Sequence, residues 1–249
     1  MQKVFYTFVL LSVSLMSCES NSDDESSSPD TSNNILTTKV DIAYSNGATE
    51  TLHYTYSGMT LIKEESSDGY YTDYIYEDNK LTEINYYDSP NPGILESYTY
   101  DAQERIATIS TNIVGIGVYD YTVTYNANNS VITTSYTNGT PDKHTVNNGN
   151  IVSFDEGGVY NSTYTYDSKN GPFKNIANRD ILLTINSENS YALNFALNNL
   201  LTEDIVETAT STNNSYTYTH TYTTFGFPRV TTEDDEGDIT TYTYTYNND

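Results

Sequence analysis

Tyr216-Thr217-Tyr218-Thr219-His220-Thr221-Tyr222 alternates large rings with threonine along the chain. Successive side chains of a β-strand point to opposite faces, so in a strand the rings share one face and the threonines the other. A helix would distribute the same rings around its circumference. The stretch Tyr119–Tyr125 repeats the alternation, and Tyr and Thr both favour strands. The sequence therefore predicts two strands that each carry a row of tyrosines on one face.

Shorter copies of this pattern recur along the whole chain. Tyr54-Thr55-Tyr56, Tyr98-Thr99-Tyr100, Tyr164-Thr165-Tyr166 and Tyr242-Thr243-Tyr244 repeat one phrase, and an apolar run such as Leu81–Ile84 follows several of the copies. Tyrosines in corresponding positions are 20 to 25 residues apart. A unit of that length holds two strands and two tight turns, and hairpins stacked in this way form an antiparallel meander. Roughly fifteen or more strands are expected.

The residues between these runs fit tight turns. Asn46-Gly47, Asp68-Gly69, Asn138-Gly139 and Asn148-Gly149 separate strand-like segments, as two-residue hairpin turns require. Asn170-Gly171-Pro172 indicates a wider loop. The sequence thus predicts an all-β, many-stranded antiparallel sheet in a single domain over residues 33–249.

One segment departs from the alternation of period two. Asn189–Leu201 has apolar residues at helical spacing, and Ser190 is a suitable N-cap. We therefore expect one short helix near residues 190–200, packed on the sheet or plugging an open end. The alternative is an irregular apolar loop.

The N-terminus has the features of a lipoprotein signal. Lys3 precedes the apolar run Val4–Leu15, which is too short to span a bilayer, and Leu15-Met16-Ser17-Cys18 forms a lipobox. Residues 1–17 are thus predicted to be a signal peptide, and Cys18, the single cysteine, is the predicted lipidation site. The alternative is an ordinary secretory peptide with an incidental cysteine.

Residues 18–32 are acidic, rich in serine and nearly free of apolar side chains, which predicts a flexible tether. The segment after Cys18 also resembles the export signal that sends Bacteroidota lipoproteins to the outer face of the outer membrane. We expect a protein anchored in the outer membrane by its lipid and facing the cell exterior. The alternative for this segment is a solvated linker without an export role.

The formal net charge of −24 limits the partners of the chain. A protein this acidic does not neutralise phosphates, so nucleic acid is not an expected partner, and contact with a membrane is expected only through the lipid on Cys18. Tyrosine is the dominant large residue, with 26 copies, so the core must be rich in tyrosine.

No catalytic or cofactor-binding motif stands out. His53, His144 and His220 lack metal-ligand spacing, and the chain has no nucleophile elbow or phosphate loop. The acidic run Glu233–Asp238 does not match a calcium loop and fits a solvated hairpin tip. We expect a protein that is not an enzyme and binds no cofactor or metal, although paired carboxylates of a glycan-active protein remain an alternative.

The tyrosine rows are the candidate binding feature. Rings exposed on a sheet stack on sugars, so a glycan is one expected partner and another envelope protein is a second. The alternative is that these rings form the core of a protein that is short of leucine and valine. The candidate ligand-stacking residues are Tyr119, Tyr121, Tyr125, Tyr216, Tyr218 and Tyr222.

Two family resemblances follow from these motifs. The phrase Tyr-x-Tyr-Asp with a later apolar strand is similar to the YD repeats of secreted bacterial proteins, although Asn79-Lys80-Leu81 only approximates their Gly-Arg-Leu. Tyr164–Ile176, Asn198-Asn199-Leu200 and Tyr222–Val230 more closely resemble an uncharacterised Bacteroidota lipoprotein family, a domain of unknown function with a porin-like fold. That resemblance implies a large antiparallel sheet, open or curled into a soluble barrel, and it implies no activity. The tyrosines at mid-strand disfavour a membrane-spanning barrel, which shows lipid an apolar band.

Overall fold

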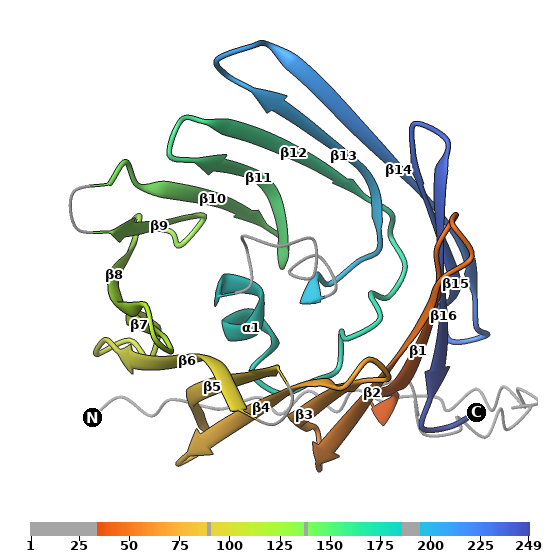
Figure 1. Ribbon diagram of the computed structural model, residues 1–249, viewed down its shortest axis with the longest axis horizontal. Helices are drawn as coiled ribbons and strands as arrows, with labels where there is room; N and C mark the ends of the chain where they lie inside the picture. Colours follow the sequence, from red (N-terminus) through yellow and green to blue (C-terminus); the bar gives the residue numbers. More distant parts are fainter. Residues whose placement is uncertain (1–33, 89–90, 137–138, 186–194) are drawn as a thin grey trace, which may run out of the picture. The chain divides into compact units, whose positions relative to one another are not determined.

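The computed structural model describes residues 34–88, 91–136, 139–185 and 195–249. In these residues, sixteen strands form one closed barrel, each antiparallel to its neighbours in the chain, and β1 pairs with β16 to close it (Figure 1). The strands are β1 (Thr37–Ala43), β2 (Thr49–Ser57), β3 (Thr60–Ser66), β4 (Tyr70–Glu77), β5 (Lys80–Asp88), β6 (Asn91–Tyr100), β7 (Ile106–Ile113), β8 (Gly117–Tyr125), β9 (Val131–Tyr136), β10 (Asp142–Asn147), β11 (Asn150–Glu156), β12 (Tyr160–Tyr166), β13 (Leu200–Glu207), β14 (Thr212–Tyr222), β15 (Pro228–Asp235) and β16 (Asp238–Tyr246).

The predicted antiparallel meander is therefore confirmed, and the sheet closes rather than staying open. Tight turns make this possible: Asn148 and Gly149 both have positive φ, 50° and 76°, as the two-residue turn between β10 and β11 requires. Asp78 and Asn79 adopt the same conformation between β4 and β5. Of the predicted turns, residue 138 lies outside the described residues.

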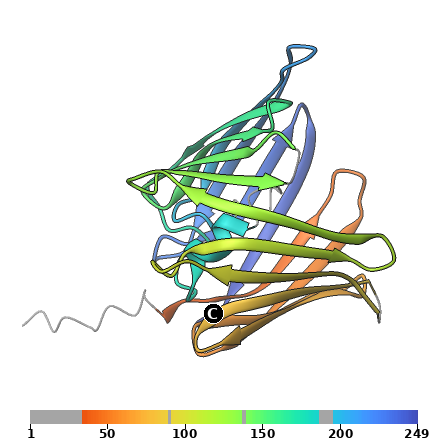
Figure 2. The ribbon, with the colours of Figure 1, turned by 90° about the vertical axis from the view of Figure 1, so that its left-hand side faces the viewer.

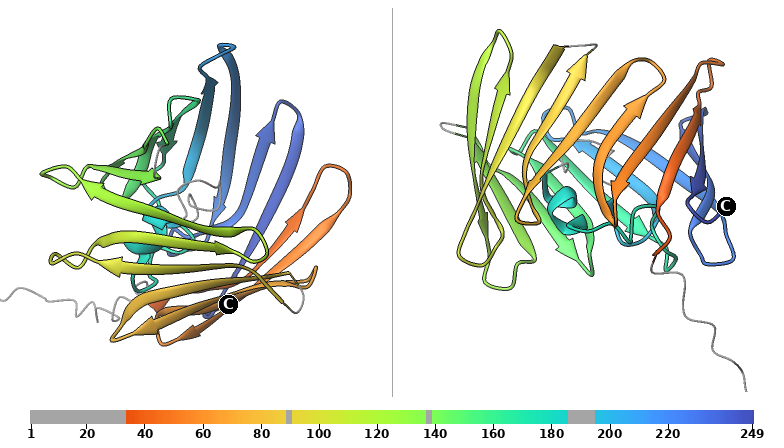
Figure 3. Two further views of the ribbon diagram at one scale, coloured as in Figure 1. Left: turned by 60° about the vertical axis from the view of Figure 1, so that its left-hand side comes forward. Right: turned by 90° about the horizontal axis from the view of Figure 1, so that it is seen from below.

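The described residues between β12 and β13, residues 167–185 and 195–199, run inside the barrel and are called the inner segment here (Figure 1). It bonds to the turns at one end of the barrel: Ala177 N–H donates to Met59 O (2.8 Å), Asn178 Nδ2 to Asn79 O (3.1 Å), and Asn170 N–H to Gly226 O (3.0 Å). We call this the plugged end and the opposite end the open end. β1 begins and β16 finishes at the plugged end (Figures 2 and 3).

One short helix, α1 (Arg179–Ile185), lies in the inner segment. One short helix was expected, and one is present, but it lies before the expected range of residues 190–200. Residues 190–194 lie outside the described residues, and Phe195–Asn199 are not α-helical. Helix α1 has only two buried residues, Leu182 and Leu183, which is too few to produce a visible helical period. No helix in the described residues is long and apolar enough to cross a membrane.

Each strand turns one face to the barrel interior. Tyr54 of β2 packs edge-on against Phe173 of the inner segment, with ring centroids 4.8 Å apart, so its side of β2 faces inward. The core cluster joins such strand residues to Phe173, Ile176 and Leu182 of the inner segment. The alternate positions, such as Thr217 and Thr219 of β14 and Thr243 of β16, face outward and are exposed.

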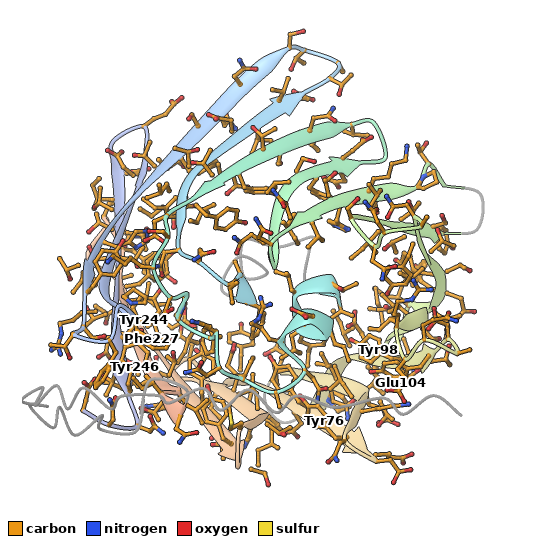
Figure 4. The ribbon with its side chains drawn as sticks, turned by 180° about the vertical axis from the view of Figure 1, so that it is seen from behind. Tyr76, Tyr98, Glu104, Phe227, Tyr244 and Tyr246 are labelled. Carbon is orange, nitrogen blue, oxygen red and sulfur yellow. The ribbon has the colours of Figure 1, made fainter. Side chains whose placement is uncertain are left out.

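The recurring tyrosines have a structural role at the plugged end. Their hydroxyls donate to a carbonyl at the start of the preceding strand, which holds neighbouring strands together. The bonds are Tyr56 to Thr37 O (2.7 Å), Tyr100 to Leu81 O (2.6 Å), Tyr125 to Ile106 O (3.0 Å), Tyr166 to Ile151 O (2.7 Å) and Tyr246 to Pro228 O (2.6 Å). Phe227, fully buried, packs beside Tyr246 with centroids 5.6 Å apart (Figure 4). The sequence repeat is thus the repeat of this tyrosine–carbonyl bond.

Candidate functional site: the inward face of the open half

The structure places the six candidate tyrosines on the inward faces of two strands, β8 and β14. In the barrel order these strands are separated by β9 to β13, so the two rows line one interior without forming a single row. Cys18 lies outside the described residues, so its predicted lipidation stays a prediction.

Two of the six tyrosines belong to the framework. The Tyr125 hydroxyl donates to Ile106 O, and its ring lies 4.3 Å from the Arg105 guanidinium. The Tyr222 hydroxyl donates to Asp167 Oδ2 (2.5 Å), a carboxylate that also accepts from Asn199. Because these hydroxyls are already engaged at the plugged end, Tyr125 and Tyr222 are the weakest of the six as ligand-binding candidates.

Tyr119 and Tyr121 lie nearer the open end and pack against a third ring. The Tyr136 centroid is 5.9 Å from that of Tyr119 and 5.5 Å from that of Tyr121. Tyr136 ends β9 and remains 43% exposed, so a ring face is accessible here. Sequence reasoning missed Tyr136 because it stands alone after Val131–Ser135 rather than in a tyrosine row.

Tyr216 and Tyr218 lie among carboxylates. The Tyr218 hydroxyl donates to Glu203 of β13 (3.5 Å), and Glu233 of β15 is paired with Tyr218 across the sheet. Tyr242 donates to Glu233 Oε2 (2.7 Å). Burial, and then the negative charge of Glu233, raise the pKa of Glu203 to about 7. This is a pair of interacting carboxylates beside a predicted tyrosine row.

A second carboxylate pair lies on β2 and β3. Glu50 accepts from Ser66 Oγ (2.6 Å) and from the Tyr44 hydroxyl (2.9 Å). Burial, followed by the charge of Glu50, raises the pKa of Glu64 to about 7, and a hydrogen bond from Tyr54 acts in the opposite direction.

Glu96 of β6 is similar but has no carboxylate partner that shifts its pKa. It accepts from the hydroxyls of Tyr98 (2.5 Å), Tyr86 (3.3 Å) and Thr111 (3.3 Å). Burial raises the pKa of Glu96, and these three donors partly offset that rise.

All of these carboxylates occupy inward positions, so they lie on the same face of their strands as the inward tyrosines. Sequence reasoning assigned the tyrosines to one face but did not extend the alternation of period two to the acids. In Glu96-Ser97-Tyr98, for example, that alternation places Glu96 on the same face as Tyr98. The carboxylates at inward positions of the described strands are Glu50, Glu64, Asp88, Glu96, Asp142, Glu156, Glu203, Glu207, Glu233, Asp235 and Asp238.

Basic side chains in the described part of the chain lie elsewhere. Lys39 and Lys63 face outward and pair with Asp41 (2.6 Å) and Glu65 (2.7 Å). Lys80 pairs with Glu104 (3.0 Å) in the plugged-end turns (Figure 4). The remaining ones are Lys143, which faces outward, and Arg105, Lys169, Lys174, Arg179 and Arg229, at the plugged end or in the inner segment. The open half of the barrel is the half of the strands nearer the open end. Among the described residues, the inward strand faces of this half therefore carry only negative formal charge.

His220 and the acidic run Glu233–Asp238 both have structural surroundings. His220 bonds Leu200 O through Nε2 (2.7 Å) and Thr231 Oγ1 through Nδ1 (2.9 Å), which is a framework role. Glu233–Asp238 spans the turn from β15 to β16, and Asp234 caps it by accepting from Gly237 N–H (2.8 Å). Among the described residues, no group of three or more His, Cys, Asp or Glu side chains is arranged to hold a metal ion.

No protein-family model matches the chain, and no curated protein matches its sequence. Among solved structures, it is similar to a porin-like protein from Bacteroides uniformis ATCC 8492, with a TM-score of 0.52 and 16% identity over 84% of this chain and 97% of that one. A porin-like protein from Bacteroides vulgatus ATCC 8482 aligns with a TM-score of 0.43 and 9% identity over 85% and 98% of the two chains. The first likeness confirms the porin-like, all-β fold that the sequence motifs implied.

Proposed function

We propose that this chain is a lipoprotein of the outer membrane, displayed on the cell surface, that acts as a binding module and not as an enzyme. The lipobox ending at Cys18 and the acidic tether support the anchor and its location. β1, the first strand after the predicted tether, begins at the plugged end.

The outward face supports a barrel that stands outside the bilayer. A barrel that spans a membrane presents apolar side chains to lipid over its mid-strand positions. Here three outward positions of β16 are Thr241, Thr243 and Thr245, with Ile239 outward near the open end, and β14 presents threonines in the same way. A threonine-rich outer wall is suited to water.

The observation that carries the binding proposal is the combination of partly exposed tyrosine rings and carboxylates on the inward face of the open half. Tyr119, Tyr121 and Tyr136 provide ring faces, while Glu203 and Glu233 flank the row of Tyr216 and Tyr218. Rings combined with a few fixed polar groups are the usual composition of a small-molecule site.

Two experiments test this proposal. Cys18→Ala should move the protein from the membrane to the soluble fraction, and a variant that stays membrane-bound contradicts the lipid anchor. Protease added to whole cells should digest the wild type if the protein is displayed on the surface. For binding, Tyr121→Ala with Tyr136→Ala should abolish retention of oligosaccharides or amines that the wild type binds. Tyr71→Ala is the control, because Tyr71 stacks on Tyr87 (4.2 Å) on the outer wall. An equal loss in the control contradicts a site inside the barrel.

A glycan-active enzyme is the second candidate, and one observation favours it. Glu203 and Glu233 interact, and the raised pKa of Glu203, about 7, suits a general acid beside a second carboxyl group. Turnover of an oligosaccharide that disappears in both Glu203→Gln and Glu233→Gln would establish it. Binding of the oligosaccharide without turnover would support the binding module and contradict the enzyme.

A further inference from the structure

The inward face of β10 to β13 holds an unusual set of groups at the open end. Lys143 pairs with Asp155 and His144 with Phe154, so the same register places Asp142 opposite Glu156. Like charges in opposite positions on neighbouring strands repel each other. Burial, and then the charge of Glu156, raise the pKa of Asp142, while the Gly157 N–H bond opposes the rise.

The set continues onto the next two strands. Tyr160 of β12 is opposite Glu156 on one side and Glu207 of β13 on the other. Tyr160 is 38% exposed, and Glu207 accepts a hydrogen bond from Thr210 Oγ1 (2.5 Å). We call Asp142, His144, Glu156, Tyr160 and Glu207 the acidic wall.

His144 provides an independent observation on the same wall. It is only 2% exposed, and its ring stacks on Phe154 at 4.5 Å with an interplanar angle of 2°. Among the described residues, neither ring nitrogen has a hydrogen-bond partner. Burial lowers the pKa of His144 to about 4, so the ring is neutral and offers one donor and one acceptor. Unsatisfied buried polar groups are uncommon in native proteins and indicate a missing partner.

Nothing basic in the described residues supplies that partner or the missing countercharge. Lys143, the adjacent residue, faces outward opposite Asp155. Arg179 forms an ion pair with Asp180 and donates to the carbonyl oxygens of Gly149 (3.0 Å) and Phe195 (2.7 Å), so its guanidinium is already engaged.

We infer that the acidic wall is the binding site of an organic ammonium ligand, such as a polyamine or the amine of a basic peptide. This inference deepens the proposed binding function and rests on it. A cation between Asp142 and Glu156 supplies the missing countercharge, and one N–H donates to the acceptor nitrogen of His144. The accessible ring of Tyr160 attracts the same cation through its face. The lack of a metal-holding group among the described residues favours an extended organic cation over a metal ion.

Spermidine is the probe, titrated into the full-length protein by calorimetry at low salt, with neutral maltohexaose as the comparison. Spermidine should bind, and Asp142→Asn with Glu156→Gln should weaken it by roughly tenfold or more. The matched control is Asp155→Asn, which removes one negative charge from the same strand pair but on the outer wall; it should change affinity by less than about twofold.

His144→Phe separates a binding role from a packing role. Phenylalanine keeps the stack on Phe154 and removes both nitrogens, so spermidine affinity should fall by roughly threefold to tenfold while the fold is retained. Unchanged affinity, or an equal loss in Asp155→Asn, overturns the assignment of the acidic wall. If maltohexaose binds and spermidine does not, the binding module stands and this inference fails. If neither ligand binds, both fail.

Discussion

Glu64→Gln should make the barrel more stable at neutral and alkaline pH. Glu64 is partly buried on the inward face of β3, where burial and then the charge of Glu50 raise its pKa to about 7 from 4.5. A carboxyl whose pKa is higher in the folded than in the unfolded state stabilises the fold below the unfolded pKa. That stabilisation is lost as the pH rises through the folded pKa.

The shift of Glu64 gives the magnitude. A pKa raised from 4.5 to about 7 corresponds to about 3 kcal/mol of stability lost between acidic pH and pH 8. Because the side chain keeps some contact with water, we expect about 1–3 kcal/mol in practice. The glutamine variant lacks this loss, so at pH 8 its free energy of unfolding should exceed that of the wild type by this amount. For a domain of this size that is roughly 2–12 °C in melting temperature.

Urea unfolding followed by tyrosine fluorescence from pH 5 to pH 8.5 measures the effect. Glu65→Gln is the control, since Glu65 is the outward neighbour, is half exposed and pairs with Lys63; neutralising it should change stability by less than about 1 kcal/mol. If Glu64→Gln keeps the pH slope of the wild type, or is less stable at pH 8, the reasoning about the inward carboxylates is wrong.

Three further outcomes follow from the structure. Glu203→Gln should also flatten the fall in stability above about pH 5, because burial and then Glu233 raise the pKa of Glu203 to about 7; pH-dependent urea unfolding tests it, and an unchanged slope contradicts it. Tyr100→Phe should lower the free energy of unfolding by about 1 kcal/mol, because it removes the hydrogen bond to Leu81 O. Tyr76→Phe should leave the free energy of unfolding unchanged, because the buried Tyr76 hydroxyl has no partner among the described residues. Equal melting temperatures of the two variants would contradict this contrast. Gly171→Ala should lower the free energy of unfolding by more than about 2 kcal/mol, because a Cβ there would lie 2.4 Å from Ala196 O. An unfolding midpoint equal to that of the wild type would show that the inner segment shifts to relieve this clash.

Much of the fold could be predicted from local chemistry. The alternation in Tyr119–Tyr125 fixes which side chains share a face, and Asn148-Gly149 fixes a two-residue turn, because both depend only on neighbouring residues. Closure between β1 and β16 depends on residues about 200 positions apart, such as Val40 and Tyr244, and no local pattern encodes it. Helix α1 at Arg179–Ile185 was not expected for the same reason, since the burial of Leu182 depends on the core cluster formed by distant strands.

The candidate site was predictable in part. Period-two alternation placed Tyr216 and Tyr218 on one face, and the structure confirms that they share the barrel interior with Tyr119 and Tyr121. The carboxylates were missed because an acid on a strand usually faces water, and only closure of the sheet makes the tyrosine face an interior. Glu203 meets Glu233 across β14, which depends on strand order and register and not on sequence spacing.

The plugged end of the barrel interior contributes hydrogen bonds that stabilise the fold, and the open end is the proposed binding region. At the plugged end, hydroxyls such as that of Tyr246 bond to carbonyls and the inner segment bonds to the turns, so many of the polar groups there have hydrogen-bond partners, with the Tyr76 hydroxyl as an exception. At the open end, carboxylates such as Asp142 and Glu156 face each other with no basic side chain of the described residues beside them, and their repulsion destabilises the folded state. A cationic ligand that binds only the folded state would recover that stability by mass action. The inward carboxylates therefore predict a trade-off, in which substitutions that neutralise the acidic wall stabilise the empty barrel and remove the affinity for the ligand.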